Sequence, residues 1–312
     1  MRKNLEAGEV DVSGLVILAV IIIILIIMPK DRPNSTSNSQ KTAISSGSYR
    51  TYQGGLNAKG GAPESEYIAI SSGNAPYSYQ SYEEYIIIQN YGSASVDITN
   101  WQLKNGKDAR AYTQGGSLQR FSADVATIPR ATLSLSASGN NILQDVVLAR
   151  GESAIITTGK VGVNHPYKIE SFKENICSGY LEALPEYAFN PPLSRNCPLP
   201  AREPGLESLD TECRRYVERM PACRTPQFET RDSNGDICHN CVDKQPLSSV
   251  CVAFVKAHFS YPGCITYHRG EPDFSKRTWR VFLGRGWEMW AKDYESIELF
   301  NQFGQLVTSQ SY

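Results

Sequence analysis

The residues of this chain whose type and spacing most directly suggest chemistry are its eight cysteines. They all fall in one segment, at Cys177, Cys197, Cys213, Cys223, Cys238, Cys241, Cys251 and Cys264. Cysteine side chains can form disulfides, bind zinc or react as nucleophiles. An even number of cysteines in a loop-rich, proline-rich segment favours disulfides, and eight cysteines allow about 105 pairings. We therefore expect a disulfide framework whose connectivity the sequence leaves open.

Zinc is the alternative use of these cysteines. Residues 238–241 (CHNC) form a C-x-x-C motif with an internal histidine, and Cys251 and Cys264 follow it. Together with Cys238 and Cys241 they are the candidate zinc ligands. A second C-x-x-C at zinc-ribbon spacing would strengthen this hypothesis, and the sequence has none. We expect no cofactor and retain zinc as the alternative.

The four histidines form no recognisable catalytic set. His165, His239, His258 and His268 do not lie in Gly-x-Ser-x-Gly, His-Glu-x-x-His or similar motifs. We therefore expect a protein that is not an enzyme. The alternative from a different class is a zinc-dependent hydrolase centred on the cysteine-rich segment.

A basic and aromatic strip follows the cysteines, formed by Lys276, Arg277, Arg280, Arg285 and Trp287. Interleaved cations and rings can bind an anionic polymer such as nucleic acid or a surface glycan. The same pattern also fits a solvated strand face beside core aromatics. The chain has 31 basic and 32 acidic residues and a net charge of −1, which gives no strong nucleic-acid signal.

The elements that must position these residues are mostly strands. Residues 83–106 (EEYIIIQNYGSASVDITNWQLKNG) predict a strand, a turn and a second strand, with a β-bulge near Thr99 and Asn100. Trp101 is expected in the core. Further strands are expected at 66–70, 131–138, 278–286, 295–300 and 305–310, with a hairpin at 144–159. Short strands at this spacing are typical of a β-sandwich.

Two helices are expected within the cysteine-rich segment. One spans residues 206–220 and begins at Ser208, and the other spans 246–259 and begins at Ser248 or Ser249. Each carries a cysteine and is too short to be stable alone in water. A cross-link would stabilise both.

Two blocks of this sequence resemble the lamin tail domain, an immunoglobulin-like sandwich. The first is residues 83–106, and the second is FLGRGWEMWAKDYESIELFNQFGQLVTSQSY, which contains Trp290 and closes the chain. The order of these blocks carries the resemblance, which covers about residues 83–170 and 275–312. It implies an interaction or scaffold module without a catalytic constellation. The chain departs from the family in the roughly 100 residues that separate the two halves.

The N-terminal residues predict a membrane anchor. Residues 15–28 (LVILAVIIIILIIM) are entirely apolar, and extension to Val12 reaches the lower end of the about 17–25 residues that span a bilayer. No small-x-small cleavage site follows, as a signal peptide would require. Flanking basic residues are balanced, so the orientation rests on the cysteines, because disulfides persist outside a reducing cytoplasm.

The expected organisation is a transmembrane anchor at residues 1–30, a flexible linker at 31–63 and a β-sandwich at 64–312, interrupted by a cysteine-rich insert at 171–274. We expect a single-pass membrane protein whose bulk is extracytoplasmic. Its expected function is non-enzymatic binding, adhesion or scaffolding at the cell surface. Its partners would be the membrane, through the N-terminal helix, and a protein or cell-surface polymer.

Overall fold

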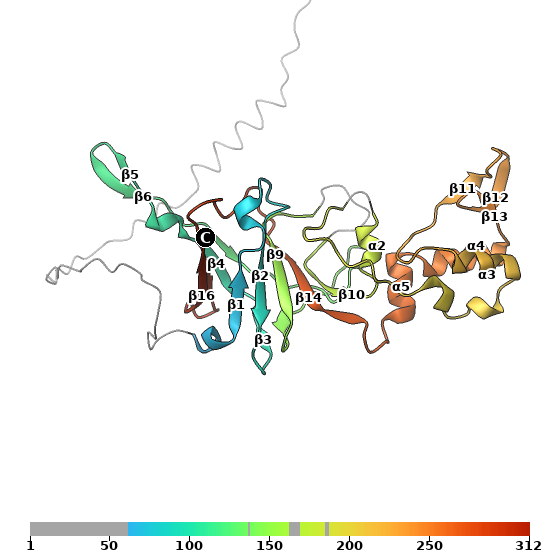
Figure 1. The fold of residues 1–312 in the computed structure, drawn as a ribbon, viewed down its shortest axis with the longest axis horizontal. Helices are drawn as coiled ribbons and strands as arrows, with labels where there is room; N and C mark the ends of the chain where they lie inside the picture. Colours follow the sequence, from blue (N-terminus) through green and yellow to red (C-terminus); the bar gives the residue numbers. More distant parts are fainter. Residues whose placement is uncertain (1–61, 137, 162–168, 185–186) are drawn as a thin grey trace, which may run out of the picture. The chain divides into compact units, whose positions relative to one another are not determined.

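The computed structural model describes residues 62–312, except residues 137, 162–168 and 185–186. All of these described residues belong to one unit, Asn57–Tyr312. The chain is mainly β, with several sheets and four disulfides, as the sequence predicts (Figure 1). The short helices all lie in the segment that separates the two halves of the β-structure or in connecting turns.

The N-terminal predictions fall largely outside the described residues. The expected anchor at 1–30 and nearly all of the expected linker at 31–63 are not described. No helix within the described ranges is long and apolar enough to span a bilayer. The linker prediction is wrong at its end, because Ala62 is buried and its N–H donates to the carbonyl of Leu306 at 3.3 Å. The short helix η1 (Pro63–Glu66) follows directly.

One sheet has five strands in the order β1-β2-β9-β14-β10. These strands are β1 (Ile68–Ser71), β2 (Tyr85–Asn90), β9 (Ser153–Thr157), β14 (Ser275–Phe282) and β10 (Phe172–Asn175). Neighbouring strands are antiparallel except β9 and β14, which run parallel. A parallel pair needs a long crossover connection. The cysteine-rich segment lies within that connection.

A second sheet has four strands in the order β16-β15-β4-β7. These strands are β16 (Leu306–Ser311), β15 (Ser296–Phe300), β4 (Gln102–Asn105) and β7 (Val125–Thr127). The hairpin of β15 and β16 confirms the prediction for the end of the chain. Its turn is held by Asn301, whose side-chain oxygen accepts hydrogen bonds from the N–H groups of Phe303 and Gln305.

Neither of the hairpins predicted at residues 83–106 and 144–159 forms. β2 pairs with β1 and β9, whereas the next strand, β3 (Val96–Asp97), pairs with β8 (Val147–Leu148), and β4 lies in the other sheet. The buried Asn90 amide donates to the carbonyls of Ala94 and Leu148, which ends β2 and redirects the chain. Local turn residues predicted a hairpin, but burial of both arms in different sheets decides the pairing.

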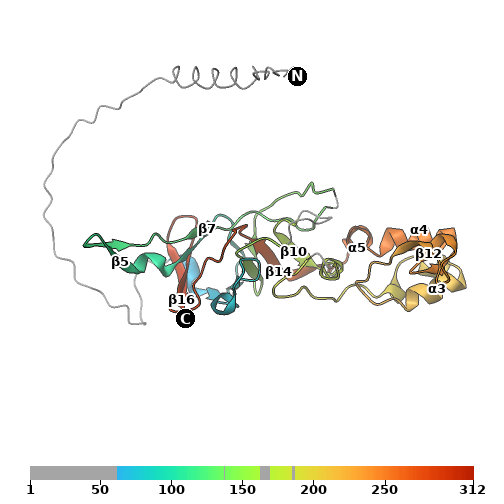
Figure 2. The same ribbon diagram turned by 90° about the horizontal axis from the view of Figure 1, so that it is seen from above.

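The predicted strand at 131–138 is also wrong. Only isolated bridges occur there, from Ala131 to Gln144 and from Thr132 to Phe172. The Thr132 hydroxyl donates to the Ser134 carbonyl, a local bond that competes with a ladder. A hairpin of β5 (Ala111–Gln114) and β6 (Ser117–Arg120) forms instead where none was expected (Figure 2).

The two large sheets, which we call the paired sheets, share one apolar core. Alternate residues of β2 are buried, including Ile86 and Ile88, and β15 buries Ile297 and Leu299. All four belong to one cluster with Trp101, which is 1% exposed. The prediction that Trp101 is a core residue is confirmed. The β-bulge expected near Thr99 and Asn100 does not form, because these residues lie in a turn between β3 and β4, where Asn100 has a positive φ of 64°.

The two sequence blocks that open and close the β-region are in direct contact. β4 pairs with β15, and Leu103 lies opposite Leu299. The buried Glu84 carboxylate accepts hydrogen bonds from the N–H groups of Met289 and Trp290, at 2.7 and 3.1 Å. Burial raises the pKa of Glu84 above its usual range. The two blocks that carry the family resemblance therefore lie side by side and share hydrogen bonds.

The insert, residues 176–274, leaves β10 and returns to β14. Its base is closed by a hydrogen bond from the Ile176 N–H to the Phe274 carbonyl at 2.9 Å. The helices and strands of the insert are α2 (Gly179–Glu182), η4 (Pro200–Arg202), η5 (Leu206–Ser208), α3 (Thr211–Glu218), β11 (Phe228–Arg231), β12 (Ile237–Val242), β13 (Gln245–Pro246), α4 (Ser249–His258) and α5 (Tyr261–His268). α3, α4 and the three-stranded sheet surround their own small core (Figures 1 and 2).

The helix predictions are partly confirmed. α4 begins after Ser248, whose hydroxyl accepts from the Cys251 N–H, as expected. The helix expected at 206–220 is split into η5 and α3, and its N-cap is Asp210 rather than Ser208. Helix α5, which contains Pro262 and Gly263 in its first turn, was not expected. Proline is tolerated in a first helical turn, and a Cβ at Gly263 would overlap the end of α4.

Candidate functional site

The predicted basic strip does not form one surface. Alternate residues of β14 face opposite sides, so Lys276 and Arg280 lie on the face opposite to Arg277. Arg280 is buried at 3% exposed, whereas Arg277 and Trp287 are exposed. Arg285 lies beyond the strand, 5.9 Å from the centre of the Trp287 ring. The structure thus brings only Arg285 and Trp287 of the five residues together.

Arg280 is occupied within the structure. Its Nε donates to the buried carboxylate of Glu174 on β10, and its two terminal nitrogens donate to the carbonyls of Pro191 and Pro192 at 2.6 and 3.2 Å. A buried arginine is stable only when its charge and donors are satisfied in this way. Arg280 therefore joins the sheet to the insert and is not available to a ligand.

All eight cysteines are paired. The disulfides are Cys177–Cys264, Cys197–Cys223, Cys213–Cys251 and Cys238–Cys241. The expectation of a disulfide-rich segment is confirmed. The candidate zinc ligands Cys238, Cys241, Cys251 and Cys264 are divided among three of these disulfides, so their sulfurs do not form one ligand set. Among the described residues, no group of three or more histidine, cysteine or acidic side chains is arranged to hold a metal.

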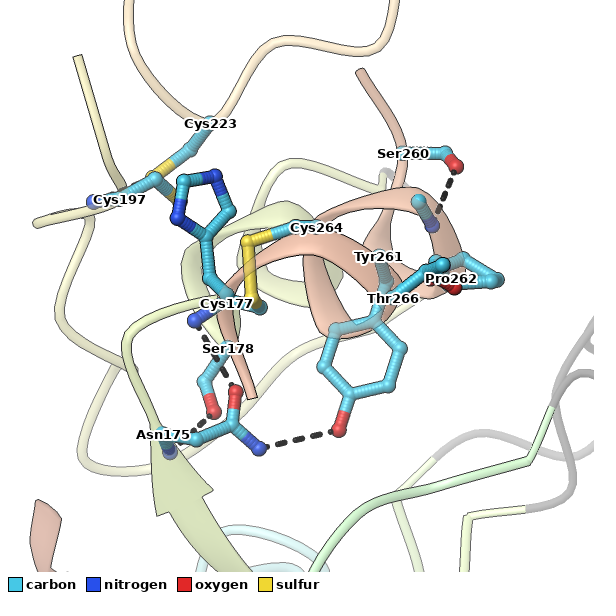
Figure 3. Close-up of a disulfide and its surroundings, with 12 residues drawn as sticks. Asn175, Cys177, Ser178, Cys197, Cys223, Ser260, Tyr261, Pro262, Cys264 and Thr266 are labelled. Atoms are coloured by element: carbon cyan, nitrogen blue, oxygen red, sulfur yellow. Dashed lines mark hydrogen bonds between the residues drawn. A yellow bond between two sulfur atoms is a disulfide. The ribbon is translucent and has the colours of Figure 1, made fainter. Parts of the chain in front are cut away.

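The Cys177–Cys264 disulfide fastens α5 to the base of the insert (Figure 3). The Asn175 side chain beside it accepts from the Cys177 N–H at 3.0 Å and donates to the Tyr261 hydroxyl at 3.3 Å. That hydroxyl also accepts from the Leu135 N–H. The disulfide, an asparagine of the sheet and a tyrosine of α5 thus hold the insert against the paired sheets.

A buried cluster of two histidines and one glutamate lies deeper in the insert. His258 ends α4, His268 ends α5, and Glu203 lies between η4 and η5; all three are at most 6% exposed. Glu203 contacts His258 Nδ1 at 2.7 Å and His268 Nε2 at 3.2 Å. The rings of Phe254 and Tyr267 stack on His258, with centroids 4.0 and 3.6 Å away. The cluster thus links α4, α5 and the segment between η4 and η5, which do not pair with one another as strands.

His268 contacts two carboxylates in this cluster. Its second nitrogen, Nδ1, contacts Glu271 at 2.6 Å, so both ring nitrogens face carboxylates. Burial alone would lower the pKa of His268, but the hydrogen bond with Glu271 and the charge of Glu203 outweigh burial and raise it. Burial and the Glu203 charge also raise the pKa of the Tyr180 hydroxyl. The cluster is an internal network in which the Glu203 carboxylate contacts both histidines and His268 contacts a second carboxylate.

The arginine pocket, our name for a surface hollow between α3 and the β12–β13 hairpin, is the candidate ligand site. Its volume is about 320 Å³, and its lining is Glu212, Arg215, Tyr216, Arg219, Met220, Arg224, Asp243 and Gln245. A second hollow of about 470 Å³ shares Arg224 and adds Arg195. Four guanidinium groups therefore border two adjoining hollows.

Asp243 fixes one side of the arginine pocket. It accepts a hydrogen bond from the Tyr216 hydroxyl at 2.6 Å and pairs with Arg224 at 3.0 Å. The oxygen that pairs with Arg224 also accepts from the Gln227 N–H. Burial and the Asp243 carboxylate raise the pKa of Tyr216, so this hydroxyl remains a donor. Asp243 is thus saturated by groups of the insert.

Arg215 and Arg219 form the free side of the pocket. Arg215 lies on α3 and Arg219 caps its C-terminal end, and both residues are exposed. Neither guanidinium group has an ion pair or hydrogen bond with any residue that the structure describes. Like charges at this spacing destabilise a helix slightly. A guanidinium group presents a planar fork of donors that matches a carboxylate or phosphate. The pocket is suited to an anionic group.

A larger apolar hollow of about 460 Å³ lies between residues 132–144 and α5. Ile142 and Leu133 border it and are 86% and 46% exposed. Its lining also includes polar side chains such as Asn140 and Gln144, but no charged side chain among the described residues. For a charged ligand, the arginine pocket is therefore the better-defined site.

Sequence reasoning missed both the histidine cluster and the arginine pocket. Glu203 lies 55 residues from His258 in sequence, so no local spacing signals their contact. For the pocket, the repeated arginines of RRYVER at 214–219 were a signal, but they read as the polar face of a helix. His239 is exposed, and His165 lies outside the described residues.

The fold and the site define a mainly β protein with a disulfide-stabilised insert that carries an arginine-lined surface pocket. Comparison with known protein families, with curated proteins and with solved structures finds no match for this chain.

Proposed function

We propose that this chain is a membrane-anchored, non-enzymatic binding protein whose insert presents the arginine pocket to a partner rich in carboxylates. In this proposal the paired sheets are an immunoglobulin-like scaffold of the lamin-tail kind. The observation that carries it is the pair of exposed, unpaired guanidinium groups of Arg215 and Arg219 beside a formed hollow.

The scaffold part is supported by the contact between the two sequence blocks. The block with Glu84 binds the backbone of Met289 and Trp290 in the other block, and β4 pairs with β15. Sequence order alone predicted that these blocks complete one another. Two sheets with a shared apolar core are the architecture that a sandwich requires.

The placement outside the cytoplasm is supported by the oxidised cysteines. Four disulfides in one segment are typical of secreted or surface-exposed domains. Residues 12–28 supply an apolar stretch of the length that an anchor needs. Together these features favour a single-pass protein with its pocket displayed at the cell surface.

A carboxylate-rich protein or polymer is the partner that the pocket fits best. Arginine binds carboxylates through two parallel hydrogen bonds, which are stronger than neutral ones. The net charge of −1 disfavours a long, sequence-independent nucleic-acid interface, which needs many basic contacts. The hydrolase alternative is less well supported, because each of its candidate cysteine ligands is in a disulfide.

The test is binding of fluorescent poly-glutamate to the full chain, with the double variant R215Q/R219Q. Two exposed charge contacts are worth about 0.5–1 kcal/mol each, so the variant should bind about fivefold to thirtyfold more weakly. Binding should also weaken as salt is added.

The matched control is K276Q/R277Q, which removes the same charge from the originally predicted strip. We expect its affinity to stay within about twofold of the parent chain. Equal losses in both variants would assign the binding to net charge and overturn the pocket. Tighter binding of duplex DNA than of poly-glutamate would replace the carboxylate partner by nucleic acid.

A further inference from the structure

The Cys238–Cys241 disulfide differs from the other three in accessibility. The six cysteines of the other disulfides are buried, and Cys241 is only 2% exposed. Cys238 is the one cysteine of the eight outside the buried group. Disulfide exchange requires a thiolate to reach one sulfur of the bond. Cys238 is therefore where a dissolved thiol can approach a disulfide of this chain.

This disulfide also closes by far the shortest loop. Its cysteines are 3 positions apart, compared with 87, 26 and 38 for the others. In the chain-entropy account, a shorter loop gives less stabilisation of the fold. Breaking this bond therefore costs the folded insert less than breaking any of the other three.

Local backbone geometry places the two cysteines together. In a regular strand, residues three apart are separated by about 10 Å, whereas these Cα atoms are 5.6 Å apart. The cause is a bulge: β12 advances from Ile237 to Cys241 while β11 advances only from Arg231 to Glu229. The excess residues bring the two cysteines within bonding distance and leave His239 and Asn240 exposed.

The hairpin has other contacts that remain when the bond opens. Val242 is fully buried in the core formed by α3 and α4. Cys241 pairs with Pro246 in β13, and the Leu247 N–H donates to the Asn240 carbonyl at 2.9 Å. Asp243 is held by Tyr216 and Arg224. The reduced cysteines would stay close enough to form the bond again.

We propose that Cys238–Cys241 is a thiol–disulfide exchange site whose substrates are protein dithiols. This inference does not depend on the anionic partner. This C-x-x-C disulfide is accessible to a thiol. The other three disulfides are buried, so they would keep the insert folded when this one is reduced.

The exchange takes place in two balanced steps. A substrate thiolate attacks the Cys238 sulfur, forms a mixed disulfide, and breaks the bond to Cys241, which leaves as a thiolate and takes up a proton. The second substrate thiol loses its proton and attacks the substrate sulfur of that mixed disulfide, and Cys238 leaves as a thiolate and is protonated. The dithiol is oxidised to a disulfide by two electrons, and the cysteine pair is reduced to two thiols.

The first experiment treats the full native chain with limiting dithiothreitol, blocks free thiols with N-ethylmaleimide and identifies the labelled cysteines by mass spectrometry. Cys238 and Cys241 should be labelled at least about tenfold faster than the other six, because exposed disulfides exchange most readily. Equal rates for all eight, or earlier labelling of another pair, would overturn the proposal. Unchanged circular dichroism during the first labelling confirms that the chain remains folded.

The second experiment tests the direction of attack and the substrate. In C241S, the remaining Cys238 thiol should form a mixed disulfide with oxidised glutathione about tenfold faster than the Cys241 thiol of C238S does. The parent chain should oxidise one dithiol peptide per chain, and C238S/C241S should oxidise none. A faster Cys241, or peptide oxidation by the double variant, would contradict the assigned site.

Discussion

The paired sheets and the insert are stabilised by different means. The paired sheets bury a continuous apolar cluster that includes Trp101 and Trp279, and they contain no cysteine. The insert contains all eight cysteines, a smaller apolar core between α3 and α4, and the buried His258–Glu203–His268 cluster. The strands of the paired sheets pair with strands that are distant in sequence, whereas the helices of the insert are joined by disulfides.

This difference follows from the size of the elements. Helices α3 and α4 have 8 and 10 residues, which is too short for stability in isolation. Small loop-rich segments bury too little apolar surface, so disulfides supply the missing stability. A region built in this way can carry exposed arginines and loops at little cost to the sheets. The insert is thus the part of the molecule with freedom to hold a site.

Two probes can follow the two regions separately. All four tryptophans, Trp101, Trp279, Trp287 and Trp290, lie in the β-region or its connecting loops, so their fluorescence reports on the paired sheets. Among the described residues, the α-helices lie in the insert, so a change in the helical far-UV circular dichroism caused by a substitution there reports on that segment. Each substitution below is expected to move one signal more than the other.

The largest effect is expected in the paired sheets. Trp101→Ala removes a fully buried ring and the hydrogen bond from its Nε1 to Gln302. The free energy of unfolding should fall by about 3–5 kcal/mol, measured by urea unfolding with fluorescence of the remaining tryptophans. Exposed Trp287 provides the matched control, because Trp287→Ala should change stability by about 0.5 kcal/mol or less. Equal losses for the two variants would contradict the core assignment.

A similar loss is expected where the two regions meet. Arg280→Met leaves the buried Glu174 carboxylate without its cation, which costs about 3–5 kcal/mol. The double variant with Glu174→Gln removes the uncompensated charge and should recover part of the loss. Both optical signals should shift together, because this arginine also binds the carbonyls of Pro191 and Pro192. A loss confined to the fluorescence signal would show that the contact does not couple the regions.

A smaller effect, confined to the insert, is expected from its helix-joining disulfide. The double variant C213A/C251A should lower the stability of the insert by about 2–4 kcal/mol. The control C238A/C241A removes a disulfide whose cysteines are 3 positions apart rather than 38. Its loss of stability should therefore be smaller by about 2 kcal/mol. Urea unfolding followed by helical circular dichroism gives both values. An equal loss of stability in the control would contradict the idea that loop length determines how much each disulfide stabilises the insert.

Much of the β-region could be predicted from sequence. The strand that begins at Tyr85, the core position of Trp101 and the turn between the last two strands follow from local patterns that the structure confirms. Strand pairing was predicted less well, because turn residues such as those after Asn90 indicate only that the chain turns. Which strand becomes the neighbour depends on contacts between distant residues, such as the Asn90 amide with the Leu148 carbonyl.

The candidate sites could be predicted only in part. The even cysteine count indicated disulfides, but pairing requires the positions of the helices. The basic strip failed because Arg280 and Arg277 lie on opposite faces of β14 and Arg280 is buried against Glu174. The arginine pocket depends on Asp243, which is left-handed at a φ of 50° and reaches back to Tyr216 across the hairpin. Such contacts have no signature in local spacing.

The smallest effect is expected from His268, and it depends on pH. The raised pKa of His268 in the folded chain means that its charged form stabilises the insert. That stabilisation is complete below the unfolded value of about 6.5 and is lost as pH rises through the raised folded value. Near pH 6 the free energy of unfolding of the parent chain should therefore exceed that of His268→Gln by about 1–3 kcal/mol, which is the cost of leaving buried hydrogen-bonding partners unsatisfied. At alkaline pH the difference should be smaller.

Helical circular dichroism during urea unfolding at several pH values measures this difference, and His239→Gln is the control, because His239 is exposed and outside the cluster. A difference that is constant with pH, or that grows as pH rises, would mean that His268 acts through packing alone. A difference that follows the predicted sign would show that buried charge, as well as covalent cross-linking, supplements the small apolar core of the insert. In that case the contrast between the two regions extends to their response to pH, since the paired sheets contain no histidine among their described residues.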